Sequence, residues 1–465
     1  MSNLIFVNSQ KGKKLLSYDG YLHSLHRSTE NKCIWRCVEF IKYKCKGRCH
    51  TTNDEESGEI IKIPTHSHPP NADKVNVKEA IDKLKNEAKT SCEPTRNVVS
   101  KIVSDVSKIT TSKLPPIDML SQTVRRTRNK YNDYPTNPIN ITDLILPDQY
   151  KVAKTGVEFL LHDINKEGKR SLIFTTENNL DFLSESDVWM ADGTFKSVPP
   201  LFSQLYTIHA CKKNATYPLV YILMTDRTKE TYSEIFKFLK TKKPNLKPSM
   251  LMVDFENAFI STFKEEFPTA VIRGCFFHFT QCVWRKIQNS GLQIKYGQDS
   301  EFALQVRLLC SLSFIPPNKV IEAFDELIES EYYIQNEELL ESIIMYFEDT
   351  WIGRRGAHFN IDLWNCYQSV IDNKPRTNNA VEGWHHAFNG SLGAHHASIW
   401  KFIKCLQLEQ GLQEAKIEKY MSGELPVKKK KIYEKLDKQL KEVVLNYEHV
   451  TVVNYLKGIA CNFSF

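Results

Sequence analysis

Three acidic residues, far apart in the chain, have the chemistry of a divalent-metal site. Asp192 ends the apolar run 188–191, and Asp254 ends the apolar run 250–253. Glu382 follows Asp254 by 128 residues, near the start of a segment with helical spacing. Hard divalent cations prefer carboxylate oxygens, and two such ions about 4 Å apart support phosphodiester cleavage. The three acids therefore predict a catalytic site for phosphodiester chemistry if the fold brings them together.

Other polar residues compete with these acids or support them. An Asp after a single strand is more often a turn or cap residue, and Glu256, close to Asp254, is an alternative to Glu382. Cys275 and His278 could hold zinc, position DNA or pack at a strand end; we expect a supporting role because two ligands alone do not make a zinc site. We expect the same of His385, three residues after Glu382.

Four residues in the first seventy have the ligand types of a structural zinc site. They are Cys37, Cys45, His66 and His68. Two thiolates and two imidazoles fill the tetrahedral shell of zinc, and residues two apart in an extended segment point to the same side, so both histidines can reach one ion. Two further thiols nearby, Cys33 and Cys49, leave the choice of cysteine ligands open.

Positive charge is concentrated at the start of the chain. Residues 1–130 hold 24 Lys and Arg against 14 Asp and Glu, a net charge of +10, whereas the whole chain carries +7. This distribution predicts a polyanionic partner for the N-terminal part. The candidate phosphate-binding residues are Arg36, Lys42, Lys44, Lys46 and Arg48 in the zinc module and Arg125, Arg126, Arg128 and Lys130 after it.

The segment 141–290 must position Asp192 and Asp254. Its apolar runs predict strands at 188–191, 202–210, 217–225, 250–253 and 270–272, with helices after the third, fourth and fifth; 171–175 is a leading strand or a lining segment. This order is that of an RNase H-like fold, in which the first and fourth strands are neighbours. The third acid lies on a helix whose predicted apolar face is Ala380, Trp384 and Phe388, with Glu382 turned inward at its first turn.

The whole chain is predicted to be a multidomain α+β protein. Its expected parts are a β-rich zinc module (1–70), a region of three helices (71–140), the first part of an RNase H-like core (141–290), a helical insertion (291–376), a completion of the core that carries Glu382 (377–420) and a basic helical tail (421–465). The region 71–140 is interpreted equally well as a DNA-binding helix-turn-helix-like bundle or as a helical linker with a basic end.

Two stretches resemble known families. Leu16-x-Tyr18-x-Gly20-Tyr21, Trp35-Arg36-Cys37, Cys45-Lys46-Gly47-Arg48 and His66-x-His68-Pro69 resemble the FLYWCH-type zinc finger, which implies a zinc module that binds DNA or protein. Asp192-Gly193-Thr194-Phe195, Val253-Asp254-Phe255-Glu256, Gly274-Cys275-x-x-His278-Phe279 and Thr377-Asn378-Asn379-x-x-Glu382-Gly383 resemble Mutator-like element (MULE) DDE transposases over about residues 150–410. That resemblance implies DNA transposition with Asp192, Asp254 and Glu382 as ligands of Mg²⁺ or Mn²⁺, by a protein that acts as a homo-oligomer.

The composition of the chain limits the cellular compartments in which we expect the protein. No run of 18 apolar residues predicts a membrane span, and twelve cysteines without a secretory leader are expected to be thiols or metal ligands rather than disulfides. A cytosolic or nuclear setting follows, and with the two resemblances we expect a nuclear protein that binds double-stranded DNA. The run Lys428–Lys431 is either a nuclear address or a solvated charge run. The main alternative to an active transposase is a catalytically idle, zinc-dependent DNA-binding regulator. An unrelated nuclease on the same fold is a weaker one.

Overall fold

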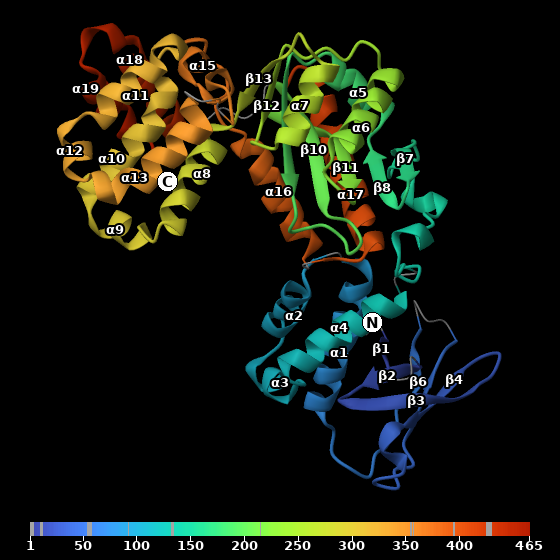
Figure 1. Ribbon diagram of the computed structural model, residues 1–465. Coiled ribbons are helices and arrows are strands. Elements are labelled where there is room, and N and C mark those ends of the chain that lie inside the picture. Colours follow the sequence, from blue (N-terminus) through green and yellow to red (C-terminus); the bar gives the residue numbers. More distant parts are fainter. Residues whose placement is uncertain are drawn as a thin grey trace. The chain divides into compact units, whose positions relative to one another are not determined.

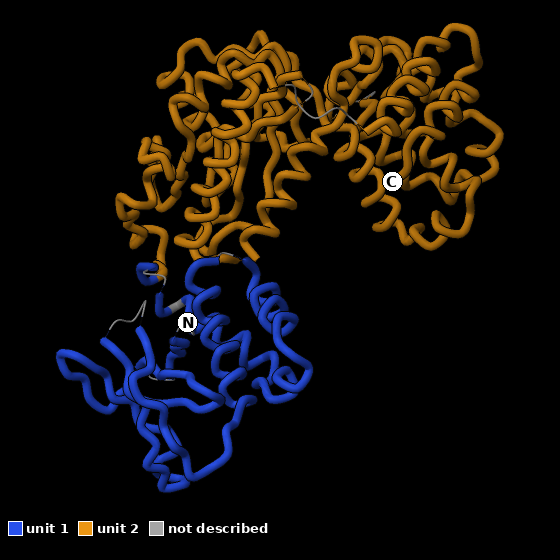
Figure 2. The backbone as a smooth tube through the Cα atoms, turned by 180° about the vertical axis from the view of Figure 1, so that it is seen from behind, with its two compact units in different colours: residues 1–136 blue, residues 137–465 orange. Residues whose placement is uncertain are grey.

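The computed structural model forms two compact units, residues 1–136 and 137–465, shown in different colours in Figure 2. It describes residues 4–9, 13–53, 58–91, 93–131, 134–213, 215–353, 356, 358–393, 396–424 and 430–465, with only the backbone of residue 129. We describe each unit by itself. Among the described residues, the chain has no helix that combines the length and the apolar character needed to span a membrane.

The first unit begins with a six-stranded antiparallel sheet whose described strands follow one another in chain order. The strands are β1 (Ile5–Asn8), β2 (Lys14–Tyr18), β3 (Tyr21–Ser28), β4 (Cys33–Cys37), β5 (Arg48–Thr51) and β6 (Ile60–Lys62). Asp19 and Gly20 connect β2 to β3 with φ angles of 49° and 75°, because a two-residue hairpin with positive φ at both positions matches the twist of the strands. The β-rich character predicted for this part is confirmed.

Four helices complete the first unit. They are α1 (Ala72–Thr90), α2 (Thr95–Ser104), α3 (Lys108–Lys113) and α4 (Ile117–Tyr131). The side chains of Leu84, Val98 and Val124 are fully buried in a core between α1, α2 and α4. Val75 of α1 instead packs into the apolar side of the sheet with Leu22.

The helices and the zinc module therefore lie in one compact unit, residues 1–136, and the division at residue 70 expected from the sequence stays a prediction. Sequence analysis also missed the short helix α3, whose Thr-rich segment has little apolar periodicity. Of the stretch 131–138, interpreted as a hinge, residues 132 and 133 lie outside the described residues.

The second unit contains a seven-stranded sheet in the order β13-β12-β9-β10-β11-β8-β7. Its strands are β7 (Leu160–Lys166), β8 (Lys169–Phe174), β9 (Val188–Thr194), β10 (Gln204–Lys212), β11 (Ala215–Met224), β12 (Met250–Val253) and β13 (Val271–Gly274). β9, β10 and β11 are antiparallel neighbours, whereas β12 runs parallel to both β9 and β13. The predicted adjacency of the first and fourth apolar runs is thus present as β9 beside β12.

Helices cover both faces of this sheet (Figure 1). On one face, α6 (Lys229–Lys242) and α7 (Asn257–Glu266) bury aromatic side chains against the sheet: Phe263 of α7 contacts Trp189 of β9, and Phe236 of α6 contacts Phe263. On the other face lie α16 (Asn379–Leu392) and α17 (Ile399–Met421), and Val381 packs there against Met190. Asp192 shares the face of Met190 because side chains two apart in a strand point to the same side.

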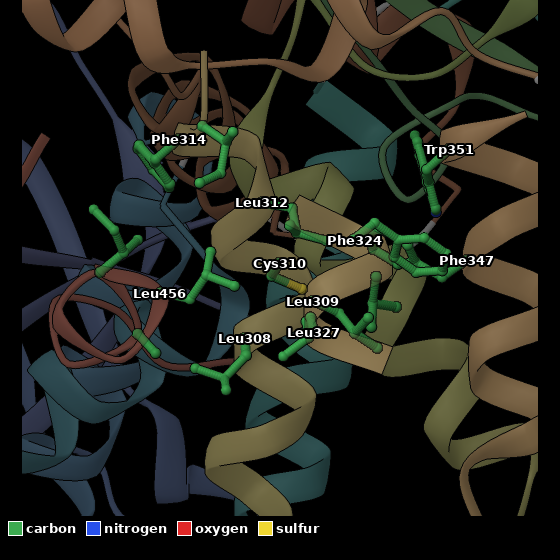
Figure 3. Packing of buried hydrophobic residues seen from close by; sticks show 14 of the residues in the cluster. Leu308, Leu309, Cys310, Leu312, Phe314, Phe324, Leu327, Phe347, Trp351 and Leu456 are labelled. Carbon is green, nitrogen blue, oxygen red and sulfur yellow. The ribbon is translucent and has the colours of Figure 1, made fainter. Parts of the chain in front are cut away.

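The segment predicted as a helical insertion forms a lobe with its own core. Its helices are α9 (Gln293–Gln298), α10 (Ser300–Ser311), α11 (Val320–Ile328), α12 (Glu331–Gln335), α13 (Glu337–Phe347), α14 (Ile361–Trp364) and α15 (Tyr367–Ile371). α8 (Phe276–Asn289), which was predicted as part of the core segment 141–290, packs into the same cluster. Figure 3 shows Phe324 and Phe347 side by side in this core, with ring centroids 5.9 Å apart, near Leu327. The mostly helical character predicted for residues 291–376 agrees with these elements.

The C-terminal residues differ from the tail expected over 421–465. α18 (Lys431–Leu445) and α19 (Val452–Ala460) bury Leu440, Val444 and Leu456 in the core of the helical lobe, and Leu456 is labelled in Figure 3. These helices are amphipathic, so their many charged residues face outward while a narrow apolar stripe completes the lobe. Of the run at 428–431, residues 428 and 429 lie outside the described part of the chain.

Candidate metal centres

The four predicted zinc ligands lie together in the first unit. The ligand atoms of Cys37, Cys45, His66 and His68 are all within 4.8 Å of one another. Cys37 ends β4, and the two histidines lie in the extended segment that follows β6. Cys37 Sγ is 3.3 Å from His68 Nε2, and Cys45 Sγ is 3.3 Å from His66 Nδ1. This two-thiol, two-imidazole cluster supports zinc binding.

The two other cysteines of the module lie elsewhere. Cys49 is fully buried against Trp35 and Leu16, in an apolar cluster. Cys33 Sγ contacts Asn53 Oδ1 at 3.2 Å on the far end of β4. Neither thiol belongs to the four-residue cluster, so the geometry favours Cys37 and Cys45 as the cysteine ligands.

His66 is held from several sides. The ring of Tyr21 stacks on it at a centroid distance of 3.7 Å and an interplanar angle of 5°. The buried His23 places its Nε2 3.2 Å from His66 Nε2, which leaves His66 Nδ1 to face Cys45. Sequence analysis missed His23. On the antiparallel strands β3 and β4, His23 lies directly opposite the zinc ligand Cys37, and this pairing is the signal that could have found it.

Gly47 must be glycine because of His66. A Cβ at Gly47 would lie 2.8 Å from two atoms of the His66 ring. We expect Gly47→Ala to push the imidazole away from Cys45, to weaken zinc binding about tenfold and to destabilise the first unit by about 1–3 kcal/mol. Competition with a chromogenic chelator measures the affinity. Gly411→Ala is a matched control, since its Cβ would meet nothing within 4 Å; equal zinc affinity of the two variants would contradict the expectation.

Asp192 and Asp254 lie at neighbouring strand positions. The parallel pairing of β12 with β9 ends at Met252 and Met190, and Asp254 follows the last residue of β12. Asp254 is close enough for its charge to raise the pKa of Asp192. Asp192 is only 5% exposed. Gly193, which follows it, has no room for a side chain because a Cβ there would lie 1.8 Å from Gln204 Nε2. In this Asp-Gly pair, Asp192 supplies a buried carboxylate, and Gly193 lets the Gln204 side chain of the neighbouring strand β10 pack closely on the backbone of β9.

The third acid arrives on the first turn of α16. Ligand atoms of Asp192, Glu382 and His278 all lie within 4.8 Å of one another, and His278 Nε2 is 3.4 Å from Glu382 Oε1. The sheet face of α16 is formed by Val381, His385, Phe388 and Leu392. The predicted face of Ala380, Trp384 and Phe388 was therefore wrong in part: Ala380 is exposed. Trp384 is half-buried and stacks on Phe388.

Burial and like charges shift the pKa values of these groups. Burial, followed by the charges of Asp254 and Glu382, raises the pKa of Asp192 well above its usual range. Burial and then the nearby Glu256 raise the pKa of Asp254 to about 6. Burial also raises the pKa of Glu382. Neighbouring carboxylates that are difficult to ionise together form a candidate functional site, because a bound cation would offset the repulsion between their negative charges.

Glu256, the alternative third acid, is occupied by other contacts. Its Oε1 accepts a hydrogen bond from the Tyr232 hydroxyl at 2.8 Å, and its Oε2 accepts one from Gln204 Nε2 at 3.3 Å. Glu256 and Asp254 are both absent from the group formed by Asp192, His278 and Glu382, so it is these two hydrogen bonds that set Glu256 apart. The geometry therefore favours Glu382.

The three residues predicted to support the site contact it in different ways. Cys275 is buried before α8, and its Sγ accepts a hydrogen bond from the backbone N–H of Asn378 at 3.3 Å, just before α16. Burial raises the pKa of the Cys275 thiol to about 12. His385 Nε2 lies 3.9 Å from Asp192 Oδ2 and 3.3 Å from Thr207 Oγ1. His278 alone of the three has a ring nitrogen among the clustered ligand atoms.

Most of the predicted DNA-binding residues are on the surface. Arg36 stacks its guanidinium over the Phe40 ring at 3.6 Å and pairs across the strands with Arg48. The exposed members of the set are Lys42, Lys44, Lys46, Arg48, Arg125, Arg126 and Lys130. Lys62 of β6 pairs with His50 of β5 on the neighbouring strands. Partial burial and the charges of Lys32, Lys62 and Arg48 lower the pKa of His50, as expected on a positively charged surface.

Arg128 has a structural contact that its neighbours do not share. Its guanidinium donates hydrogen bonds to the backbone carbonyls of Ala88, Ser91 and Glu93 at the end of α1. We expect Arg128→Ala to lower the free energy of unfolding of the first unit by about 2 kcal/mol, whereas the exposed Arg125→Ala changes it by less than about 0.5 kcal/mol. Urea denaturation followed by circular dichroism measures both, and equal stabilities would refute this role for Arg128.

Two family models match the regions just described. A model of the FLYWCH zinc finger domain matches residues 6–68, which include the four clustered zinc ligands. A model of the MULE transposase domain matches residues 188–282, which include Asp192, Asp254 and His278 but end before Glu382. No curated protein matches the chain. The chain thus carries a FLYWCH zinc finger domain followed by a MULE transposase domain.

Proposed function

We propose that the protein is a DNA transposase of the MULE type, in which Asp192, Asp254 and Glu382 hold two divalent cations, Mg²⁺ or Mn²⁺. The observation that carries this proposal is the parallel β9–β12 register, which sets two acids side by side, together with the α16 turn that adds the third. The zinc finger domain and the basic residues of the first unit support DNA as the substrate.

We further propose that the sheet is an RNase H-like core. Three antiparallel strands, β9, β10 and β11, are followed along the chain by β12 and β13, which add in parallel beside β9. This order agrees with that expected from the sequence. The antiparallel strands β8 and β7 extend the opposite edge.

The residues present fit divalent cations. Asp192 is buried among like charges, and Glu382 Oε1 is buried without a hydrogen-bond partner among the described residues. Such unsatisfied carboxylate oxygens are costly unless a cation meets them. Bound ions would supply a clamp on the attacking and leaving oxygens of an in-line phosphoryl displacement.

The chain itself orients these ligands. His385 contacts the carboxylate of Asp192 and the hydroxyl of Thr207, which limits rotation of the Asp192 side chain. Cys275 fixes the start of α16 through the Asn378 backbone and so sets the position of Glu382. The first unit would bring DNA to the site with its exposed basic residues, and we place this activity in the nucleus, with two or more copies acting on one pair of DNA ends.

A cleavage assay tests the proposal. The full chain, with zinc bound, is incubated with a duplex that carries the terminal inverted repeats flanking its own gene, in Mg²⁺ or Mn²⁺. We expect nicking or strand transfer that Glu382→Gln lowers at least about 100-fold, because loss of an outer-sphere partner alone costs 10- to 100-fold. Glu230→Gln, on an exposed position of α6, is the matched control. Equal activity of Glu382→Gln and wild type would refute the role of Glu382.

A second function is favoured by the separation of the first unit. Residues 1–136 form a compact unit with its own sheet, helical core and zinc cluster. We propose as the alternative a regulator that binds DNA through this unit without cutting it. DNA binding that depends on zinc, combined with no cleavage of any duplex in either metal, would favour this alternative.

A further inference from the structure

We propose that His278 is a direct metal ligand, so that one ion position of the site is a mixed carboxylate–imidazole set, Asp192–His278–Glu382, selective for a divalent transition metal over Mg²⁺. This inference rests on the proposed function in that it concerns the same site. It departs from it in the ligand set, because the three acids alone make an all-oxygen site.

The spacing of the ligand atoms is the first argument. Two ligands bound about 2.1 Å from one ion at a tetrahedral angle lie about 3.4 Å from each other. His278 Nε2 and Glu382 Oε1 are 3.4 Å apart. The zinc cluster of the first unit has the same spacing, with Cys45 Sγ 3.3 Å from His66 Nδ1.

The missing hydrogen bond is the second argument. Glu382 Oε1 and His278 Nδ1 are both buried without a hydrogen-bond partner among the described residues. In the contact itself, Glu382 Oε1 is the unpartnered atom, 3.4 Å from His278 Nε2, whereas the unpartnered Nδ1 is the other nitrogen of the ring. A cation between Nε2 and Oε1 would accept both lone pairs and leave the ring proton on Nδ1.

The third argument is that the chain fixes these two side chains relative to each other. His278 is the third residue of α8, and Glu382 is the fourth residue of α16. The segments before these helices are joined by two hydrogen bonds, from Phe276 N to Arg376 O at 2.9 Å and from Asn378 N to Cys275 Sγ at 3.3 Å. Ligands on such cross-connected helix starts are preorganised rather than brought together by chance.

Ligand chemistry gives the selectivity. Mg²⁺ takes oxygen ligands almost exclusively, whereas imidazole nitrogen is a good ligand for first-row transition metals. Asp254 lies outside this group but near Asp192, and it can share Asp192 with a second, oxygen-only position. The site would then have two unlike positions.

Manganese binding tests the proposal. The zinc-loaded full chain is titrated with Mn²⁺, free Mn²⁺ is followed by electron paramagnetic resonance, and Mg²⁺ is added as competitor. We expect His278→Ala and His278→Gln each to weaken Mn²⁺ binding about tenfold and to reduce the preference for Mn²⁺ over Mg²⁺. We also expect pulsed electron paramagnetic resonance of the wild type to show a histidine nitrogen coupled to Mn²⁺. Both variants should lose this nitrogen coupling. His162→Ala, on the exposed side of β7, is the control.

Two results would overturn the inference: Mn²⁺ affinity of His278→Gln within about twofold of wild type, or a wild-type spectrum without coupled nitrogen. The glutamine variant keeps a hydrogen-bonding side chain, so it separates a ligand from a residue that only positions Glu382. Cleavage of DNA without the nitrogen coupling would leave the transposase proposal intact and reject this one. Nitrogen-coupled Mn²⁺ without any DNA cleavage would support His278 as a metal ligand and reject the transposase proposal.

Discussion

Asp254→Asn is expected to abolish metal-dependent DNA cleavage and, in the same protein, to increase the metal-free stability of residues 137–465 at pH 7. The loss of activity should be at least about 100-fold, since a proposed ligand of one of the two ions is neutralised. The gain in stability follows from the cost of keeping this acid ionised next to Asp192 and Glu256. Burial and Glu256 raise its pKa from 3.8 to about 6.

The sign of the pH dependence follows from that shift. Between pH 4 and 6 the folded state binds more protons than the unfolded state, so the contribution of Asp254 to stability falls as the pH rises through this range. Above pH 6 the full penalty is present. Asparagine carries no such penalty, so the gain should be about 3 kcal/mol at pH 7 and about half that at pH 5.

Urea denaturation followed by tryptophan fluorescence measures the gain, because six of the seven tryptophans lie in the second unit, at 189, 284, 351, 364, 384 and 400. The experiment is done without divalent cations other than the structural zinc. Asp187→Asn, at the exposed position before β9, is the matched control and should change neither activity nor stability appreciably. A destabilised or fully active Asp254→Asn protein would contradict the site described above.

The strands and the acids that follow them could be predicted because each is marked by a few consecutive residues in the sequence. The run Met250–Val253 is apolar at every position, as a strand covered on both faces requires, and Asp254 is its first polar residue. The chain order of such runs also indicated that Asp192 and Asp254 would be neighbours. The same reasoning identified Cys37, Cys45, His66 and His68, since residue type alone limits what can bind zinc.

What could not be predicted depends on contacts between distant segments. His278 meets Glu382 where a backbone hydrogen bond from Phe276 to Arg376 joins the starts of two helices that are about one hundred residues apart in the chain. The buried face of α16 was misjudged because a helical pattern of apolar residues treats histidine as polar and therefore exposed. His385 is in fact buried, where it contacts Asp192 and Thr207. Arg128 looked like one of several DNA-binding arginines, and only its position next to the end of α1 distinguishes it.

Zinc loss should have the second large effect, on the first unit. In zinc-finger peptides the metal contributes an apparent 10–16 kcal/mol or so, comparable to or larger than the roughly 5–15 kcal/mol that stabilises a whole domain. We therefore expect Cys37→Ser to lose bound zinc, to lose cooperative unfolding of the sheet β1–β6, and to lose tight binding to DNA. Zinc content by elemental analysis, amide hydrogen exchange and fluorescence anisotropy with a labelled duplex measure the three effects.

Cys33→Ser is the matched control, because Cys33 lies four residues earlier on the same strand and contacts Asn53 rather than the cluster. It should retain zinc and DNA binding. The second unit should keep its fold in Cys37→Ser, since its core is made of its own residues. Residual nicking of non-specific plasmid DNA by Cys37→Ser, abolished by adding Asp254→Asn, would then assign DNA recognition to the zinc module and cleavage to the acids. Tight DNA binding that survives in Cys37→Ser would instead assign recognition to another surface.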